Sequence, residues 1–452
     1  MKLGLIAMSG VRADDPELTR AGLTMPGIME RGQVIASLPS LSLLTLAALT
    51  PADFSVEYRE VRDLAADGDL PMDYDLVAIS GLSAQILDAY VLADRFRAAG
   101  VPVVMGGLHV TTCPEEALEH ASAVVVGEGE PVWPRVVEDF RAGRLGGVYR
   151  ADREYDLADA PIPRYDLLDI DKYNRIPVQT SRGCPHRCDF CASSILLTRR
   201  YKVKPVEKVV AEVRRIKELW RHPFIEFADD NSFAMRGHYK QLLRALKPER
   251  IRWFTETDIS VAEDDELLDL MREAGCREIL VGLESPSPAG LDGVEMRANW
   301  KLRQLPRYEE AVRKIQCRGI AVNGCFVLGL DGDTEATLDE IYAFVDRTNL
   351  FDVQITVMTP FPGTPLYERL LKDGRILRPG AWNRCTLFDV NFAPRNFTPE
   401  RLQAALMELA RRLYDPAFTR ARRERFMEDC RRHRVRPLLN VHGLGAEYAD
   451  AV

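Results

Sequence analysis

The sequence predicts an α/β protein with two parallel sheets in series and a helical C-terminal extension. Apolar, strand-like runs alternate with helical stretches over residues 1–138, and this alternation resumes over residues 176–365. Repeated strand–helix–strand order predicts parallel sheets covered by helices. The chain has 452 residues, of which 46% are hydrophobic and 28% charged, and this is enough for two or three globular domains.

The composition narrows the class of protein. The formal net charge is −8, whereas a protein whose main partner is nucleic acid needs a basic surface, so we expect no nucleic-acid partner. Six of the nine cysteines stand singly, which is typical of a reduced, cytoplasmic protein rather than of a disulfide framework. These six are Cys113, Cys276, Cys317, Cys325, Cys385 and Cys430.

Two stretches bear on localisation. Residues 1–7 run directly into a strand-like segment, so we expect no signal peptide. Residues 33–52 carry no charge, but prolines, serines and threonines interrupt them, whereas a membrane-spanning helix needs about 20 predominantly apolar residues. We expect a buried amphipathic helix at this point and a cytoplasmic protein without a membrane span.

Small residues follow three of the five strands that we expect in the first unit. Ligands of open parallel sheets bind outside the carboxyl ends of the strands, and a glycine lets the backbone approach a flat cofactor closely. We interpret this edge as a cofactor site, although each glycine alone is also typical of an ordinary tight turn. The strands are expected at 3–7, 55–59, 75–79, 101–105 and 123–126, and the small or turn residues are Ser80, Gly81, Gly106, Gly107, Gly127, Glu128, Gly129 and Glu130.

Residues 139–175 lack periodicity, and prolines interrupt them between residues 159 and 168, which predicts an extended connection between domains. Six further strands are expected beyond it. Six strand–helix units favour a partial barrel with its site at the carboxyl ends of the strands. The expected strands lie at 178–181, 224–230, 251–258, 278–284, 321–329 and 353–359.

Acidic and polar pairs stand at the ends of four of these strands. A charged residue at a strand end can simply solvate a turn, but four successive pairs at one edge favour a binding site. The pairs are Asp229 and Asp230, Glu256 and Asp258, Glu284 and Ser285, and Asp331 and Asp333.

Three cysteines follow the first strand of the second unit. Cys184, Cys188 and Cys191 have C-x3-C-x2-C spacing, so their thiolates can converge on one metal centre. A closed zinc site or an ordinary cubane iron–sulfur cluster takes four protein ligands, whereas three leave one iron open to a small molecule. The alternatives are a zinc site completed by His186 and three free thiols.

This loop resembles that of the radical S-adenosylmethionine (SAM) superfamily. The resemblance rests on the cysteine spacing, on the Arg-Gly before it and on Phe190 in the last gap. It implies a TIM-type partial (β/α)6 barrel with a 4Fe–4S cluster on Cys184, Cys188 and Cys191. The open iron would bind SAM, and an electron from the cluster would cleave SAM to a 5′-deoxyadenosyl radical.

The resemblance also implies roles for other side chains. Glu284, in the Gly282–Ser285 motif, would bind the SAM ribose, and Phe190 would pack near the adenine. Asp229 and Asp230 lie in the segment whose backbone would meet the SAM amino group. Glu256 is a candidate polar contact, and Gly329 lies in a segment that bounds the adenine and substrate space. The implied contacts are Phe190, Asp229, Asp230, Glu256, Gly282, Glu284, Ser285 and Gly329.

The first unit is similar to the Rossmann-like (flavodoxin-like) cobalamin-binding domain that precedes many radical SAM enzymes. The order of elements carries this resemblance: a helix over residues 39–48, then strands ending in Ser-Gly, in Gly-Gly-x-His and in Gly-Glu-Gly-Glu. The D-x-H-x-x-G motif that supplies a histidine to cobalt in other cobalamin proteins is missing. His109 is expected to make a turn or rim contact, so cobalamin would be held without a protein histidine below cobalt.

That family contains methylases and the anaerobic magnesium-protoporphyrin cyclase. The resemblance implies an oxygen-sensitive enzyme that methylates an unactivated carbon of a small molecule, a secondary metabolite or a lipid-like compound, through a 5′-deoxyadenosyl radical and methylcobalamin. The alternative is a radical cyclisation, rearrangement or group transfer with a vestigial or non-methylating cobalamin domain. The implied partners are the substrate and an electron donor such as flavodoxin or ferredoxin.

The last 87 residues are expected to be helical. Four leucines between residues 402 and 413 fall on one helical face after Thr398 and Pro399, a plausible N-cap and first-turn proline. A second helix, expected over 417–432, is rich in arginine, which is more typical of a solvated face than of an anion site. The predicted domains are 1–138 (cobalamin-binding), 139–175 (linker), 176–365 (radical SAM barrel) and 366–452 (helical).

Overall fold

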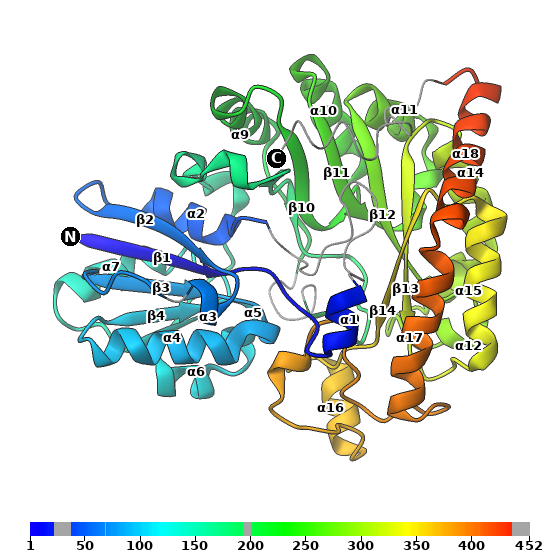
Figure 1. Ribbon diagram of the computed structural model, residues 1–452. Coiled ribbons are helices and arrows are strands. Elements are labelled where there is room, and N and C mark those ends of the chain that lie inside the picture. Colours follow the sequence, from blue (N-terminus) through cyan, green and yellow to red (C-terminus); the bar gives the residue numbers. More distant parts are fainter. Residues whose placement is uncertain (22–37, 68, 193–199, 436–452) are drawn as a thin grey trace.

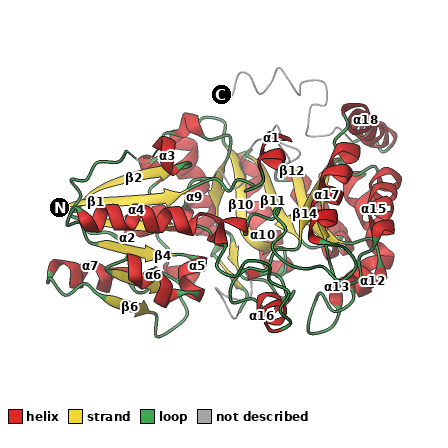
Figure 2. Cartoon of the chain, turned by 60° about the horizontal axis from the view of Figure 1, so that its bottom comes forward, coloured by secondary structure: helices red, strands yellow, loops and turns green. Residues whose placement is uncertain are grey.

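The computed structural model describes residues 1–21, 38–67, 69–192 and 200–435. Two six-stranded parallel sheets lie side by side, the first built from the N-terminal part of the chain and the second from residues 176–357 (Figure 1). Figure 2 shows helices of the second unit, such as α15 (Glu335–Thr348) and α18 (Pro416–Arg432), on the outer side of its strands. The predicted α/β class with two parallel sheets is confirmed.

The first sheet has the flavodoxin-like order β2-β1-β3-β4-β5-β6, and every pair is parallel. Helices α2 (Leu41–Leu49) and α7 (Trp133–Arg141) pack on one face, and α4 (Ile86–Ala98), α5 (Leu108–Thr112) and α6 (Pro114–His120) pack on the other. The strands are β1 (Lys2–Met8), β2 (Ser55–Val61), β3 (Leu76–Ser80), β4 (Val103–Gly106), β5 (Ala123–Val126) and β6 (Gly147–Arg150).

The sixth strand was not predicted. β6 lies in the segment that the sequence analysis assigned to the linker, and it pairs with β5. Only Tyr149 of its four residues is buried, so the strand has no hydrophobic pattern of its own. The first sheet therefore continues to residue 150, beyond the predicted boundary at 138.

The buried helix expected within residues 33–52 is α2, in which Leu43, Leu44, Thr45 and Ala47 are buried. Residues 33–37 lie outside the described part of the chain. Two short helices complete the first unit, α1 (Pro16–Ala21) and α3 (Leu64–Asp67). Among the described residues, no helix combines the length and the apolar character that a bilayer span requires.

The second sheet is the predicted six-stranded partial barrel, with the order β14-β13-β12-β11-β10-β7. Its strands are β7 (Ile176–Val178), β10 (Phe224–Ser232), β11 (Arg252–Thr257), β12 (Cys276–Glu284), β13 (Ala321–Leu328) and β14 (Asp352–Val357). Its helices are α9 (Val206–Leu219), α10 (Arg236–Leu246), α11 (Asp265–Glu273), α12 (Pro288–Leu291), α13 (Trp300–Gln304), α14 (Tyr308–Gln316) and α15.

A two-stranded antiparallel ribbon stands at the carboxyl end of β7. It pairs β8 (Ser181–Arg182) with β9 (Lys202–Val203), and Arg182 lies opposite Lys202. The segment between these two strands carries all three motif cysteines. The ribbon is therefore the neck of the predicted cluster loop.

In its described part, to residue 435, the C-terminal extension contains the predicted helices, α16 (Pro365–Lys372), α17 (Pro399–Leu413) and α18, with a largely irregular segment between α16 and α17. Thr398 caps α17 by accepting a hydrogen bond from the Arg401 amide, and Pro399 occupies its first turn.

The expectation of a solvated arginine face on α18 is wrong at two positions. Arg422 is fully buried and donates to the carbonyl oxygen of Leu413, and Arg423 donates to the buried Asp352 at 2.8 Å. Because Asp352 begins β14, α18 closes the amino-terminal end of the barrel at this strand. The arginine-rich segment continues past α18 to Arg436, which lies outside the described residues.

Candidate functional site

A cavity of about 530 Å³ lies between the two sheets, at the carboxyl edge of the first. Every small or acidic residue that the sequence analysis placed at this edge lines it. The first-unit lining includes Ser80, Gly81, Gly106, Gly107, Gly127, Glu128, Gly129 and Glu130. The structure thus brings the three predicted turns together around one space.

Gly107 has a backbone that other residues rarely adopt. Its φ is +117°, and a Cβ at this position would lie 3.2 Å from the Gly81 carbonyl oxygen and 3.3 Å from the Ser80 Oγ. A side chain here would therefore be strained and would crowd the neighbouring turn. The requirement for glycine keeps this edge open to a large flat group.

The cavity has an apolar side between the first sheet and α2. Leu43 and Leu46 from α2 and Trp133 from α7 line it together with Val104 and Val125 from the strands. A glycine-rich rim leading to an apolar slot fits a corrin ring with a nucleotide tail. The residues present therefore fit cobalamin.

His109 does not line this cavity. Its side chain is fully buried, with its ring nitrogens 3.1 Å from the Ser83 Oγ and 3.4 Å from a Glu116 carboxylate oxygen, and it packs against the edge of Trp382. Burial lowers the pKa of the imidazole, although Glu116 opposes this shift. His109 therefore joins helices of the first unit to the C-terminal segment, which is a buried contact rather than a rim contact.

The second unit supplies the opposite wall of the cavity through Ala228 and Asp230 of β10, Arg182 of β8 and Gln179, which follows β7. An Asp230 carboxylate oxygen accepts a hydrogen bond of 2.6 Å from the Gly183 amide, directly before the first motif cysteine. The cavity therefore reaches the base of the cysteine loop.

The side chain of Asp229, the neighbour of Asp230, is engaged within the protein. Its carboxylate accepts hydrogen bonds from the backbone amides of Thr180 and Ser181, both at 2.8 Å, and from the Tyr239 hydroxyl at 3.0 Å. The side chain is 5% exposed, so these bonds occupy it fully. Asp229 holds the strand end that leads into the cysteine loop.

The three motif cysteines lie near one another in this loop. Burial raises the pKa of Cys184 to about 11, and the proximity of Cys191 contributes to the rise. Burial also raises the pKa of Cys188, with a contribution from both other thiols. Within the described residues, no three side chains already stand in a metal-coordinating arrangement. The assignment of a cluster therefore rests on the spacing of the thiols, on their proximity and on the family described below.

Strand ends of the barrel hold the loop from one side. The Asn231 amide donates to the Cys184 Sγ at 3.5 Å and to an Asp258 carboxylate oxygen at 2.9 Å. The same Asp258 oxygen lies 3.1 Å from the His186 Nε2, and His186 stacks on Trp300 with ring centroids 4.0 Å apart. His186 is thus engaged with Asp258 and Trp300, which disfavours the zinc alternative.

Glu284 forms a buried ion pair that the sequence analysis missed. The Lys301 Nζ lies 3.0 Å from the Glu284 Oε1 and donates to the Gly282 carbonyl oxygen at 2.5 Å. A Cβ at Gly282 would lie 2.5 Å from the Glu284 Oε1, so glycine makes room for this pair. Lys301 also interacts electrostatically with Cys188, so a cation stands beside the cluster loop.

Ser285 and Phe190 both contact other groups of the protein. Ser285 is fully buried, and its Oγ accepts a hydrogen bond from the Ser287 amide at 3.2 Å. Phe190 is half-buried against the main hydrophobic core.

Glu256 faces the inside of the barrel. Its side chain reaches solvent there, while Trp253 and Thr255 of the same strand are buried. Desolvation inside the barrel, together with the neighbouring carboxylates of Glu226 and Asp230, raises the pKa of Glu256 to about 7, although Arg175 opposes the rise. This side chain is therefore available to a ligand in the barrel.

Asp331 and Asp333, the acidic pair that follows β13, make contacts that stabilise the fold. Asp331 forms ion pairs with Arg369 at 2.6 Å and Arg375 at 3.1 Å, and Asp333 accepts hydrogen bonds from the amides of Gly329 and Leu330. A Cβ at Gly329 would lie 2.7 Å from Leu402, so this glycine allows close packing of α17. The interpretation of Asp331 and Asp333 as site residues is therefore not supported by their contacts.

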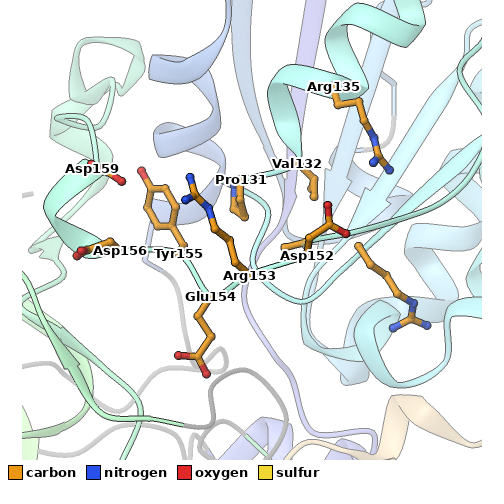
Figure 3. Close-up of a pocket in the computed structure, with 11 residues that line it drawn as sticks. Pro131, Val132, Arg135, Asp152, Arg153, Glu154, Tyr155, Asp156 and Asp159 are labelled. Carbon is orange, nitrogen blue, oxygen red and sulfur yellow. The ribbon is translucent and has the colours of Figure 1, made fainter.

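A second pocket, of about 560 Å³, lies beside the loop that follows β5 (Figure 3). Figure 3 shows side chains of both charges around it, among them Arg153, Asp152 and Glu154. All three are exposed on the surface. This pocket lacks the glycine-rich edge and the cysteine loop, so we do not assign a cofactor to it.

Comparison with known proteins identifies the family. The chain matches the Radical SAM superfamily over residues 178–345, the B12 binding domain over residues 38–137, and a domain of unknown function (DUF4070) over residues 364–445. It is 32% identical over 393 residues to an uncharacterized methyltransferase of Synechocystis, covering 84% of this chain and 71% of that protein. The chain belongs to the radical SAM enzymes with a cobalamin-binding domain. Its cofactors are a 4Fe–4S cluster, SAM and cobalamin.

Two further known proteins are similar to this chain, one in sequence and one in fold. The chain is 28% identical over 385 residues to the bacteriochlorophyllide d C-12(1)-methyltransferase of Chlorobaculum tepidum, covering 83% of this chain and 82% of that protein. The fold is similar to that of the radical SAM methyltransferase TsrM of Kitasatospora setae, with a TM-score of 0.67 at 18% identity. That likeness covers 92% of this chain and 89% of the other, so the radical SAM enzyme described here has the same two-sheet architecture.

Proposed function

We propose that this enzyme transfers a methyl group from SAM to an unactivated carbon of a small molecule. The single observation that carries the proposal is the shared cavity, whose walls are the glycine-rich edge of the first sheet and the base of the cysteine loop. A cofactor seated on that edge faces the barrel in which SAM is cleaved. The methyltransferases among its relatives support the same reaction class.

The chain divides the work between its two units. In the proposal, the turns at Gly81, Gly107 and Gly127 support the ring, while the slot between α2 and the sheet takes the nucleotide tail. Cobalamin supplies methyl-carrying chemistry when bound, and the cluster supplies the electron that cleaves SAM. The protein's own contribution is to place both groups at one chamber and to exclude water from it.

Two side chains are proposed to orient SAM. Glu284 and Lys301 form a buried pair at the carboxyl end of β12, beside Cys188. The carboxylate can accept a hydrogen bond from a ribose hydroxyl, and the ammonium group can pair with the SAM carboxylate. Because both groups are less than 10% exposed and already paired, the site is organised before SAM arrives.

The substrate is proposed to enter the barrel beside Glu256. This side chain is the exposed acid on the inner face of β11, and its pKa of about 7 lets it accept or donate a hydrogen bond near neutral pH. The enzyme also needs an external reductant, for which we propose a flavodoxin or a ferredoxin in the cytoplasm.

The test is anaerobic reconstitution of the cluster with and without added cobalamin, followed by mass spectrometry of the products made from SAM. The proposal predicts S-adenosylhomocysteine only when cobalamin is present, and 5′-deoxyadenosine in both samples. Methyl transfer accounts for the first product and reductive cleavage for the second. An enzyme that binds no cobalamin and forms only 5′-deoxyadenosine would instead be a radical SAM catalyst without methyl transfer.

A further inference from the structure

The neck of the cysteine loop is held by a carboxylate from the first unit. Glu128 belongs to the turn after β5, yet its Oε1 accepts hydrogen bonds of 2.7 Å from the Arg182 guanidinium and of 2.7 Å from the Lys202 ammonium group. Arg182 lies in β8 and Lys202 in β9, directly opposite each other in the ribbon. One carboxylate therefore joins both legs of the loop that carries Cys184, Cys188 and Cys191.

Two like charges that face each other across a ribbon are destabilising on their own. The side chains of Arg182 and Lys202 are 16% and 14% exposed, so water screens their repulsion poorly. Glu128, which is 8% exposed, lies between them and compensates both cations. The pairing of β8 with β9 is thus stabilised by Glu128, which lies 54 residues before Arg182 in the chain.

Further contacts from the connecting segment and from the first unit hold this carboxylate and its partners in place. The Tyr155 amide donates to the Glu128 Oε2 at 2.7 Å, and the Tyr155 carbonyl oxygen accepts from Lys202 at 2.9 Å. Figure 3 shows Tyr155 in the connecting segment beside the surface pocket. Glu130 adds a second bond of 2.6 Å to Arg182. The first sheet, the connecting segment and the ribbon therefore meet at Glu128.

The same residues line the proposed cobalamin cavity. Glu128, Glu130 and Arg182 all belong to its wall, whereas Lys202 does not. We propose that Glu128 is a positioning residue: it clamps the neck of the cysteine loop to the cobalamin cavity, so that cobalamin binding and cluster binding favour each other. This inference rests on the proposal that cobalamin occupies this cavity.

Thermodynamic linkage makes the proposal quantitative. If the clamp couples the two sites, the cluster raises the affinity for cobalamin by the same factor by which cobalamin raises the affinity for the cluster. Coupling between sites is typically about 5–150-fold. A direct contact between Glu128 and cobalamin would behave differently, because it would act equally whether or not the cluster is bound.

The experiment measures the dissociation constant of hydroxocobalamin by absorbance titration, on protein with a reconstituted cluster and on protein stripped of iron by anaerobic chelation. In the wild type, the two constants should differ by about 5–150-fold. In Glu128→Gln, which keeps the shape but removes the charge, the ratio should fall to near one. Glu154→Gln, an exposed acid in the connecting segment, should keep the wild-type ratio.

A second variant keeps the test decisive if Glu128→Gln folds poorly. Lys202→Met removes one leg of the clamp without touching the cavity wall, and it should reduce the ratio partially. A lowered cobalamin affinity with an unchanged ratio would overturn the clamp and leave Glu128 as a simple contact. A wild-type ratio of one would also overturn it, whereas a failure to bind cobalamin in any sample would contradict the proposed function instead.

Discussion

The first sheet is covered by helices on both faces, whereas the inner face of the second sheet carries charged side chains. The central strands of the first sheet, β1, β3, β4 and β5, are almost continuously apolar, and all four residues of β5 are buried. Strands of the barrel alternate: Phe227 and Ile279 pack in the outer core, while Glu226 and Glu278 of the same strands point to the other face. The two units therefore place their chemistry differently, at an edge in one and on a face in the other.

This difference follows from what each unit has to hold. A flat cofactor at a sheet edge needs backbone with no side chains in the way, and Gly107 provides it. A reaction chamber inside a barrel needs polar groups, and buried charges need partners. The barrel supplies these partners at its closed end, where Glu226 pairs with Arg175 and Asp352 pairs with Arg423.

The largest expected effect concerns the cysteines of the barrel unit. Replacing Cys184, Cys188 or Cys191 by alanine should abolish bound iron–sulfur absorbance and SAM cleavage, because each thiolate is a required ligand. Iron analysis, the visible absorbance of the cluster and 5′-deoxyadenosine formation measure this. Cys113→Ser should leave all three largely intact, and reductive SAM cleavage by a triple-alanine protein would contradict the assignment.

The next prediction tests the edge of the first sheet. Gly107→Val should eliminate cobalamin retention and S-adenosylhomocysteine formation, because a β-branched side chain is strained at φ +117° and crowds Ser80 and Gly81. Formation of 5′-deoxyadenosine should remain measurable. Gly146→Ala, on the exposed surface of the same unit, is the matched control and should retain cobalamin. Undiminished cobalamin binding by a folded Gly107→Val protein would contradict the assignment of cobalamin to this edge of the first sheet.

A third prediction concerns SAM binding at the end of β12. Glu284→Gln should weaken SAM binding by about 10–150-fold, since a hydrogen bond to a charged group is worth about 1.5–3 kcal/mol. The melting temperature should fall as well, because Lys301 then stays buried without its partner. Isothermal titration with SAM measures the first effect. Glu310→Gln, an exposed acid of α14, should change neither quantity, and unchanged SAM affinity in Glu284→Gln would exclude the role.

The smallest expected effect tests the inner face of the barrel through pH. Burial, together with Asp352, raises the pKa of Glu278 to about 8, although Arg423 and Arg175 oppose the rise. The folded state then binds a proton that the unfolded chain releases near pH 4.5, so this contribution to stability falls as pH rises toward 8.

Glu278→Gln should remove that dependence. Relative to the wild type, the variant should gain stability between pH 6 and pH 8 by at most about 2–3 kcal/mol. Denaturant unfolding at the two pH values measures the difference. An equal difference at both pH values would show that Glu278 is not protonated in the folded protein.

Much of this architecture is predictable from local pattern. The alternation of strands and helices defines both sheets, and the cysteine spacing together with the glycine turns marks both walls of the cavity. Strand β6 was missed because its four residues have no apolar period. Lys301 was missed because no motif surrounds it, and its partner Glu284 lies 17 residues earlier.

The long-range contacts were not predictable in the same way. Glu128 carries a recognisable turn motif, but its partners Arg182 and Lys202 lie 54 and 74 residues further along the chain. The buried arginines of α18 did leave a signal: Arg422, Phe426 and Cys430 recur at a spacing of four and share the buried face. The abundance of exposed arginines on the same helix hid that face.

The most direct test of the account is whether the two cofactors occupy the shared cavity together. Electron paramagnetic resonance of the reconstituted enzyme, with cobalamin in the Co(II) state and the cluster reduced, reports on the interaction between the two unpaired spins. The account predicts that each cofactor alters the relaxation or line shape of the other, because both adjoin the cavity lined by Gly107 and Arg182. A spectrum equal to the sum of the two separate signals, from protein with both cofactors bound, would contradict it.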